Sequence, residues 1–248
     1  MKNHLFIRTG LVALACFGFG KIFADNFPAT TAPVGRDGSS LITPVNQIVT
    51  PAGTLIELPG MRPQALALSP DGKILVTSGL THELVALDPA MGNILQRVPL
   101  PPDAVGEQKP VTSLILNPDD KAQVSFTGLA FSPDGSRIYL SNVNGDLKVF
   151  SVAKDKTISR LASFPLPPDA APSRKAEIPA GIAVSADGKK IYVALNLSNR
   201  LIEMDAATGK VLRTWNVGVA PFDVVLAGHK IYVSNWGGRR PDANSVTG

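Results

Sequence analysis

The amino-acid sequence predicts an all-β protein built from repeated four-stranded antiparallel units. Three segments align with one another, each of about 40 residues: Pro63–Leu100, Phe126–Leu166 and Pro179–Val217. A fourth copy begins at Pro221. Each complete copy holds four short runs of β-prone residues that are separated by turn residues. Repeats of this kind, joined by hairpins alone, indicate a β-propeller, because a β-sandwich does not repeat its turns so regularly.

The first run of each copy alternates small residues with larger apolar ones. Such a strand has two unequal buried faces. Small residues suit the innermost strand of a propeller blade, because the blades converge toward the axis and leave little room there. The small residues are Ala65 and Ala67, Gly128 and Ala130, and Gly181 and Ala183.

A tight turn follows each first run. Its sequence is Ser-Pro-Asp-Gly at 69–72 and 132–135, and Ser-Ala-Asp-Gly at 185–188. Proline presets its own φ, the Asp side chain bonds the nearby backbone, and Gly accepts a positive φ. These residues therefore predict a hairpin between the first and second strands.

The remaining strands follow from the same alignment. The third strands end at Asp88 and Asp205, before turns that close at Gly92 and Gly209. The second strands are expected at Lys73–Thr77, Arg137–Ser141, Lys190–Ala194 and Lys230–Ser234, and the outer strands at Ile94–Val98, Ile158–Phe164 and Val211–Val217.

Residues 1–24 have the pattern of a signal peptide. Lys2 and Arg8 precede a short apolar run, and Ala24 offers a cleavage site before Asp25. Lys21 interrupts the run, which is shorter than the roughly 20 apolar residues of a spanning helix. We expect a periplasmic or secreted protein with no membrane span after signal removal. An uncleaved anchor and a lipid anchor on Cys16 are the alternatives.

The rest of the chain is expected to contain an irregular segment at 25–45 and a propeller at 46–248. Its blades should span about 59–100, 126–166, 179–218 and, in part, 220–248, with loop insertions at 101–125 and 167–178. The runs Gln47–Val49 and Thr54–Leu58 resemble the last half of a repeat and could complete the final blade, which would give a ring of four blades. We prefer an incomplete part of a larger, seven-bladed ring, because 242–248 resembles an interrupted loop.

Charge and cysteine content restrict the class of protein. The whole chain has 24 Lys and Arg against 20 Asp and Glu, and signal removal takes away three bases and no acid, leaving a net charge of +1. We therefore expect no nucleic-acid partner. The single cysteine is Cys16, so the mature chain has no disulfide and depends on core burial.

Two segments within the repeats resemble the signature of a known family. Ile231–Asn235 and Ile138–Asn142 are similar to the Tyr-Val-Thr-Asn signature of YVTN-repeat propellers, although Leu195 and Ser78 replace the signature Asn in the other copies. The likeness covers roughly 47–238, and it implies the propeller fold more than any one function.

A second likeness is narrower. Trp236–Pro241, with Ile42–Pro44 and Thr50–Gly53, resembles exported bacterial proteins in which a YVTN propeller precedes a phosphoesterase of the alkaline-phosphatase superfamily. This implies a binding or scaffold module belonging to a longer protein, with the metal-binding catalytic domain absent from this sequence.

The sequence shows no catalytic constellation, and we expect no metal and no cofactor. Only His82 and His229 remain after signal removal, each in a predicted turn, and no Walker loop, dinucleotide fingerprint or Gly-x-Ser-x-Gly elbow occurs. Lactonase-like hydrolases share the architecture and work at the channel mouth, so such an enzyme is the alternative function.

A small molecule or protein partner is expected at the mouth, on loops that follow the second strands. Arg239 and Arg240 could bind a phosphate or carboxylate, with Trp236 as a stacking surface; a solvated loop is the competing interpretation. The candidate ligand-binding residues are Asn142, Asn144, Asn196, Asn199, Asn235, Trp236, Arg239 and Arg240.

Overall fold

The computed structural model describes residues 30–37, 40–50, 52–79, 83–101, 124–169, 174 and 176–245. The expected signal peptide with Cys16, most of the first loop insertion, and His82 lie outside these residues. Contacts divide the chain after Leu55 into two compact units, which are described separately. No helix long and apolar enough for a membrane span occurs in the described part.

The first unit holds a small antiparallel sheet where the sequence suggested an irregular segment. Its strands are β1 (Gly35–Asp37), β2 (Ser40–Ile42) and β3 (Ile48–Val49), in that order across the sheet. Ile42 is buried and pairs with Ile48. The strand β3 therefore belongs to this sheet, whereas the sequence suggested that this run could complete the final propeller blade.

The second run that could have completed a blade is also not a strand. Thr54–Leu58 has no strand assignment, and its residues are mostly exposed. Prolines and glycines bracket this run, and the Met61 amide donates to the Leu58 carbonyl at 3.1 Å. The chain therefore turns here, and it forms no ladder.

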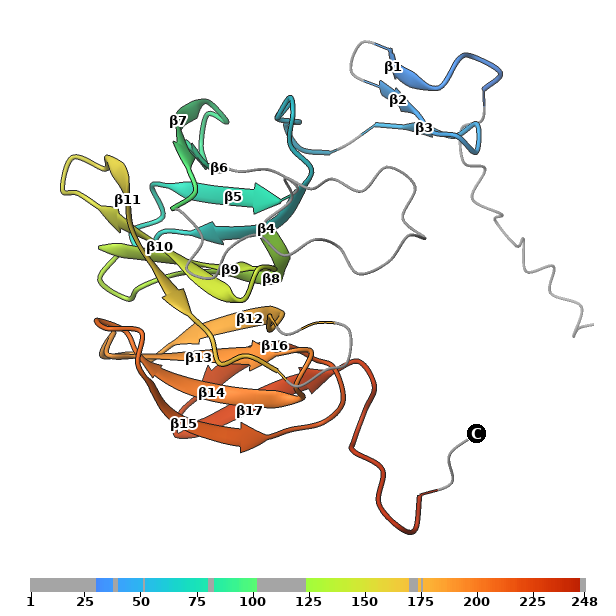
Figure 1. Cartoon of the computed structure of the whole chain (residues 1–248). Helices are drawn as coiled ribbons and strands as arrows, with labels where there is room; N and C mark the ends of the chain where they lie inside the picture. The colour runs from blue at the N-terminus through green and yellow to red at the C-terminus, as the bar shows by residue number, and fades with distance from the viewer. Residues whose placement is uncertain are drawn as a thin grey trace, which may run out of the picture. The chain divides into compact units, whose positions relative to one another are not determined.

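Four sheets form the second unit (Figure 1). In each sheet the strands lie in sequence order, so every neighbouring pair is an antiparallel hairpin. The all-β fold of four-stranded, blade-like sheets is as predicted. Blade 1 holds β4 (Pro63–Leu68), β5 (Leu75–Gly79), β6 (Glu83–Leu87) and β7 (Ile94–Pro99). Blade 2 holds β8 (Val124–Phe131), β9 (Arg137–Asn142), β10 (Asp146–Val152) and β11 (Ile158–Pro165). Blade 3 holds β12 (Pro179–Val184), β13 (Lys190–Leu195), β14 (Arg200–Asp205) and β15 (Val211–Asn216), and the hairpin of blade 4 holds β16 (Pro221–Ala227) and β17 (Lys230–Asn235).

The turn between first and second strands folds as its sequence predicts. In blade 1, the Ser69 hydroxyl donates to the Asp71 carboxylate at 2.6 Å, and the Gly72 amide donates to the Ser69 carbonyl at 2.8 Å. Gly72 has a φ of +70°. Blades 2 and 3 repeat the Ser-to-Asp bond at the same length, so each hairpin closes with donors and acceptors of its own.

First strands of successive blades lie against one another, as the small residues predict. β4 contacts β8, β8 contacts β12, and β12 contacts β16. A Cβ added to Gly128 would clash with the Ala180 carbonyl oxygen, and one added to Gly181 would lie 2.6 Å from the Cα of Asp223. Glycine is therefore required here by close packing.

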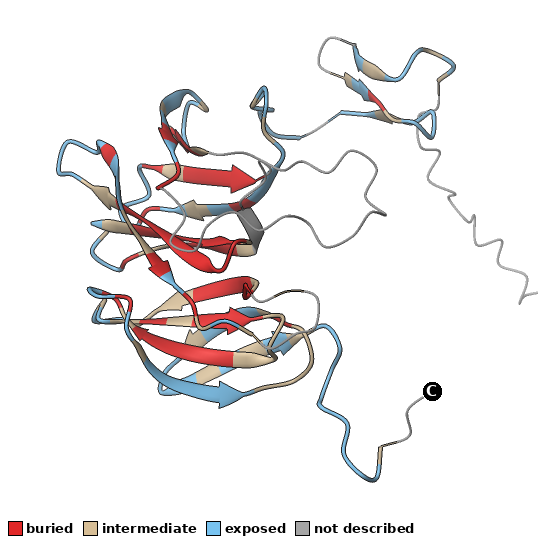
Figure 2. Ribbon diagram, in the orientation of Figure 1, coloured by how far each residue is buried: buried red, intermediate tan, exposed pale blue. Residues whose placement is uncertain are grey.

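Three hydrophobic clusters join neighbouring blades. The first includes Val76 and Leu84 of blade 1 with Leu140 and Phe150 of blade 2. The second joins blades 2 and 3, and the third joins blade 3 to blade 4. Figure 2 shows that buried residues gather on the middle strands, whereas β15 is exposed along almost its whole length.

Candidate functional site

The predicted site residues follow the second strands of blades 2, 3 and 4. Asn142 ends β9, and Asn196 and Asn199 lie in the turn between β13 and β14. Asn144 lies between β9 and β10, and Asn235 ends β17 and precedes Trp236, Arg239 and Arg240. The structure shows what each of these side chains contacts.

Two of the asparagines hold blade 3 to blade 4. The Asn196 side-chain amide donates to the Pro221 carbonyl at 3.0 Å. The Asn199 side-chain oxygen accepts from the Ala220 amide at 2.7 Å. Both side chains are half-buried, and Asn199 has a φ of +57°. Their polar atoms therefore support the backbone between blades.

Asn142 belongs to a buried polar cluster that sequence analysis did not identify. Its amide donates to the Asp146 carboxylate at 2.6 Å, and the Lys148 ammonium donates to the other Asp146 oxygen at 3.1 Å and to the Ser163 hydroxyl at 3.3 Å. Asn142, Asp146 and Lys148 are completely buried, and Asn144 beside them is also buried. A buried ion pair is costly unless its groups are paired.

The aligned repeats hold the signal that would have revealed this cluster. Lys148 pairs across the sheet with Leu140, and the residues at the same position in blades 1 and 3 are Val85 and Ile202. A lysine at a position that is otherwise apolar marks blade 2 as different from its neighbours.

The two predicted arginines have different surroundings. Arg240 donates through Nε to the Val217 carbonyl at 2.7 Å and through Nη2 to the Asn199 carbonyl. Arg239 is ion-paired with Asp242 at 3.2 Å, and both side chains are largely exposed, by 70% and 61%. Arg240 thus fixes the loop to blade 3, whereas Arg239 faces solvent.

Trp236 and Asn235 complete the predicted set. The Trp236 ring stacks on Phe222 of β16, with centroids 4.3 Å apart and an interplanar angle of 21°. Trp236 remains 64% exposed. The Asn235 amide donates to the Val233 carbonyl at 3.2 Å, and its buried side-chain oxygen has no hydrogen-bond partner among the described residues.

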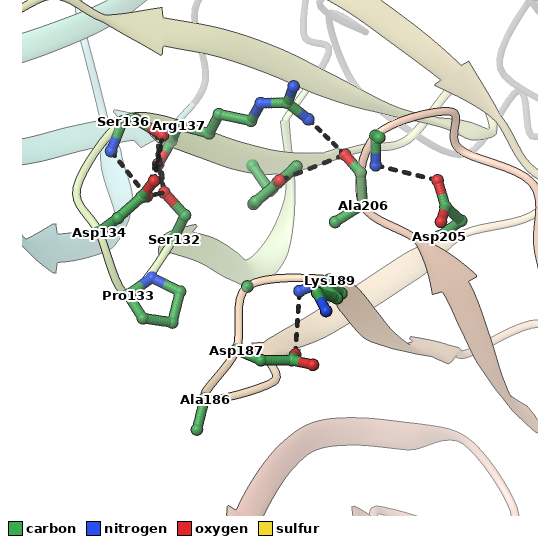
Figure 3. Close-up of a pocket in the computed structure, with 13 residues that line it drawn as sticks. Ser132, Pro133, Asp134, Ser136, Arg137, Ala186, Asp187, Lys189, Asp205 and Ala206 are labelled. Atoms are coloured by element: carbon green, nitrogen blue, oxygen red, sulfur yellow. Dashed lines mark hydrogen bonds between the residues drawn. The ribbon is translucent and has the colours of Figure 1, made fainter.

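A pocket of about 380 Å³ lies where turns of blades 2 and 3 meet (Figure 3). Arg137 reaches across it and donates to the Ala206 carbonyl at 2.6 Å, and the Tyr139 hydroxyl lies 3.4 Å from the same oxygen. Three carboxylates line the pocket: Asp134, Asp187 and Asp205.

These carboxylates are held by their own turns. The Ser132 hydroxyl holds the pKa of Asp134 below its usual value, and the Ser185 hydroxyl does the same for Asp187. The Thr208 hydroxyl lowers the pKa of Asp205. Lowered pKa values keep these groups ionised near neutral pH, which is unsuited to a general acid.

The pocket therefore has the character of a structural junction between blades. Burial raises the pKa of Tyr139, so that side chain stays protonated. No group of three or more residues able to hold a metal ion occurs in the described ranges. The pocket was not among the sites predicted from sequence, because its lining comes from turn residues with an evident folding role.

Comparisons with known proteins support the fold alone. No family model and no curated protein sequence matches this chain. A functionally unknown protein from Desulfotomaculum acetoxidans is similar over 84% of this chain and 62% of its own, with a TM-score of 0.54 and 16% identity. The RRP9 WD40-repeat structure is similar over 69% of this chain and 44% of its own, with a TM-score of 0.50 and 12% identity.

Hydrazine synthase from Kuenenia stuttgartiensis is a third similar structure. It matches 70% of this chain, with a TM-score of 0.49 and 20% identity, and the chain spans 41% of its length. The chain thus covers less than two thirds of each of these structures. Together with the blades described above, the likeness to the RRP9 WD40-repeat structure shows a β-propeller domain.

Proposed function

We propose that this chain is an exported propeller module that binds a partner and carries out no reaction by itself. One contrast supports the proposal. Most polar side chains predicted to form the mouth site bond the blades themselves, whereas Trp236 and Arg239 present a ring and a guanidinium to solvent.

The chemistry of these two residues suits an acidic partner group beside a flat apolar one. A guanidinium binds carboxylate or phosphate through paired hydrogen bonds, and an exposed indole offers a stacking surface. The Arg239–Asp242 pair is largely exposed. Pairs of that kind are worth about 0–1 kcal/mol, so an incoming anion can displace Asp242 at little cost.

The resemblance to YVTN propellers that precede a phosphoesterase extends this proposal. On that likeness, the module belongs to a longer exported polypeptide whose catalytic domain carries out the reaction. The gene sequence beyond the codon for Gly248 tests this part. An in-frame phosphoesterase domain supports it, and a stop codon at that point refutes it.

Binding at Trp236 can be measured with the chain's own fluorescence. The chain has two tryptophans, so Trp215→Phe leaves Trp236 as the only reporter. Phenyl phosphate, which combines a ring with a dianion, is the probe. We expect saturable quenching, and Arg239→Ala should weaken binding about 10- to 100-fold, the usual effect of losing a hydrogen bond to a charged group.

Lys154→Ala provides the matched control, because Lys154 is an exposed base in a turn of blade 2. It should leave the affinity unchanged. An absence of saturable quenching, or equal affinity in the Arg239→Ala protein, would refute the proposed site.

The alternative is a lactonase-like hydrolase. The three carboxylates of the pocket between blades 2 and 3 have lowered pKa values, which are unsuited to a general acid. Assay with glucono-δ-lactone separates the two functions. Turnover that Arg239→Ala abolishes would overturn the binding-only proposal.

A further inference from the structure

The connector at 217–220, which leads from blade 3 to blade 4, is paired with the site loop at 236–240. The site loop carries both residues of the binding site proposed above, Trp236 and Arg239. Its backbone is bonded to the connector at three points: the Trp236 amide donates to the Ala220 carbonyl at 3.0 Å, the Gly237 amide to the Val219 carbonyl at 2.9 Å, and the Val219 amide to the Gly238 carbonyl at 2.9 Å. The shape of the connector therefore sets the path of the site loop.

Ala220 gives the connector an unusual shape. Its φ is +51°, in the left-handed region that disfavours residues with a Cβ atom. Arg62 and Ile178 also stand directly before the proline that begins a blade, and neither has a positive φ. Strained backbone of this kind persists only where the surrounding contacts hold it, and it is concentrated at binding and active sites. Ala220 therefore needs a partner that keeps it in this conformation.

Asn199 is that partner. Its side-chain oxygen accepts from the Ala220 amide at 2.7 Å. Its carbonyl accepts from the Val217 amide at 3.1 Å and from the Arg240 guanidinium. The same guanidinium donates through Nε to the Val217 carbonyl at 2.7 Å. Asn199 thus contacts both ends of the connector and the last residue of the site loop.

Blade 2 separates the role of the Asn199 side chain from the role of its backbone. The equivalent residue there is Gly145, because each of the two directly precedes the third strand of its blade and has a positive φ, +88° for Gly145 and +57° for Asn199. The Gly145 carbonyl accepts from the Leu166 amide at 2.9 Å, as the Asn199 carbonyl does from the Val217 amide. A glycine therefore suffices for this turn, and the side chain of Asn199 serves the added bond to Ala220.

We propose that Asn199 is a positioning residue for the binding site formed by Trp236 and Arg239. Its side chain holds Ala220 in the left-handed conformation, and the Ala220 carbonyl in turn fixes the Trp236 backbone. A loop that is ordered in advance loses less conformational freedom on binding, so the affinity should depend on this bond. The inference rests on the function proposed above, but the order of the loop can be measured without any ligand.

Asn199→Gly tests the proposal in the Trp215→Phe protein, in which Trp236 is the only tryptophan. The variant allows the backbone that Gly145 has in blade 2 and removes the side-chain bond to Ala220. We expect lower fluorescence anisotropy of Trp236 and stronger quenching by acrylamide, which report the mobility and the accessibility of the ring. The affinity for phenyl phosphate should fall about 2- to 10-fold, the usual effect of losing one hydrogen bond.

Gln96→Ala is the matched control. The Gln96 side-chain oxygen accepts from the Ile158 amide at 2.9 Å, so it too joins one blade to the backbone of the next, between blades 1 and 2. Its loss should leave the anisotropy of Trp236 and the affinity unchanged. Asn199→Asp keeps an oxygen acceptor at the same place and should preserve the anisotropy. Circular dichroism and thermal unfolding would verify that each variant is folded.

Other outcomes would overturn the proposal. Unchanged anisotropy in the Asn199→Gly protein, or unchanged affinity where the unaltered protein binds, would show that the side chain does not position the site. Equal changes in the Gln96→Ala protein would show a general loss of blade packing instead. If the unaltered protein does not bind phenyl phosphate, the proposed function fails, and the anisotropy of the Asn199→Gly protein still decides whether this side chain orders the loop.

Discussion

Replacement of Lys148 by methionine tests the energetic cost of the buried ion pair in blade 2. Lys148 and Asp146 are completely buried, and their charged atoms lie 3.1 Å apart. Methionine matches the length of the lysine stem but removes the ammonium. The variant therefore leaves the Asp146 carboxylate in the protein interior with the Asn142 amide and without its cation.

The expected loss of stability is about 3–5 kcal/mol, which is typical when one partner of a buried pair is removed. For a domain of this size, each kcal/mol lowers the melting temperature by about 2–4 °C, so the fall should be roughly 6–20 °C. The double variant Asp146→Asn with Lys148→Met removes both charges. It should recover most of this loss, because it leaves no unpaired charge in the protein interior.

Thermal unfolding and urea denaturation followed by circular dichroism measure both effects. Lys154→Met is the same substitution at an exposed position, and it should change stability by no more than about 0.5 kcal/mol. The reasoning is refuted if Lys148→Met costs under about 1 kcal/mol, or if the double variant is as unstable as the single one.

Two further predictions concern a turn and the central packing. The pKa of Asp134 is lowered in the folded protein, chiefly by the Ser132 hydroxyl, so its stabilising effect is present above its unfolded pKa of about 4 and is lost as pH falls through the lowered value. Asp134→Asn should accordingly flatten the pH dependence of the melting temperature below about pH 4, and an unchanged profile would contradict the assignment. Gly181→Ala should destabilise by about 1–3 kcal/mol, because the added methyl group meets Asp223. Gly53→Ala, where the methyl group enters open space, should have little effect, and equal melting temperatures for the two variants would argue against close packing at Gly181.

The blades were predictable because their signals are local. Ser69, Asp71 and Gly72 satisfy one another within a single turn, so the hairpin follows from a few adjacent residues. The small residues of the first strands likewise reported the crowding at Gly128. The turn residues and the small residues recur in each copy, so alignment of the copies makes the pattern easier to recognise.

The roles of the mouth residues were not predictable in the same way. Asn196 and Asn199 have the composition of a ligand site, but their partners are backbone groups of the next blade. Pairing of β3 with β2 depended on the burial of Ile42, which no local pattern reports. Both outcomes depend on contacts between segments that are distant in sequence.

The three hydrophobic clusters also bear on how a destabilising substitution in one blade affects the stability of the others. Each cluster joins a blade only to its immediate neighbours, so the row of blades is energetically close to a one-dimensional chain of coupled units. A substitution that destabilises one blade therefore lowers the stability of the adjacent blades directly, and that of more distant blades only weakly. In this 248-residue chain, blades 2 and 3 each share a cluster with a blade on both sides, so we expect them to be more resistant to local opening than blades 1 and 4.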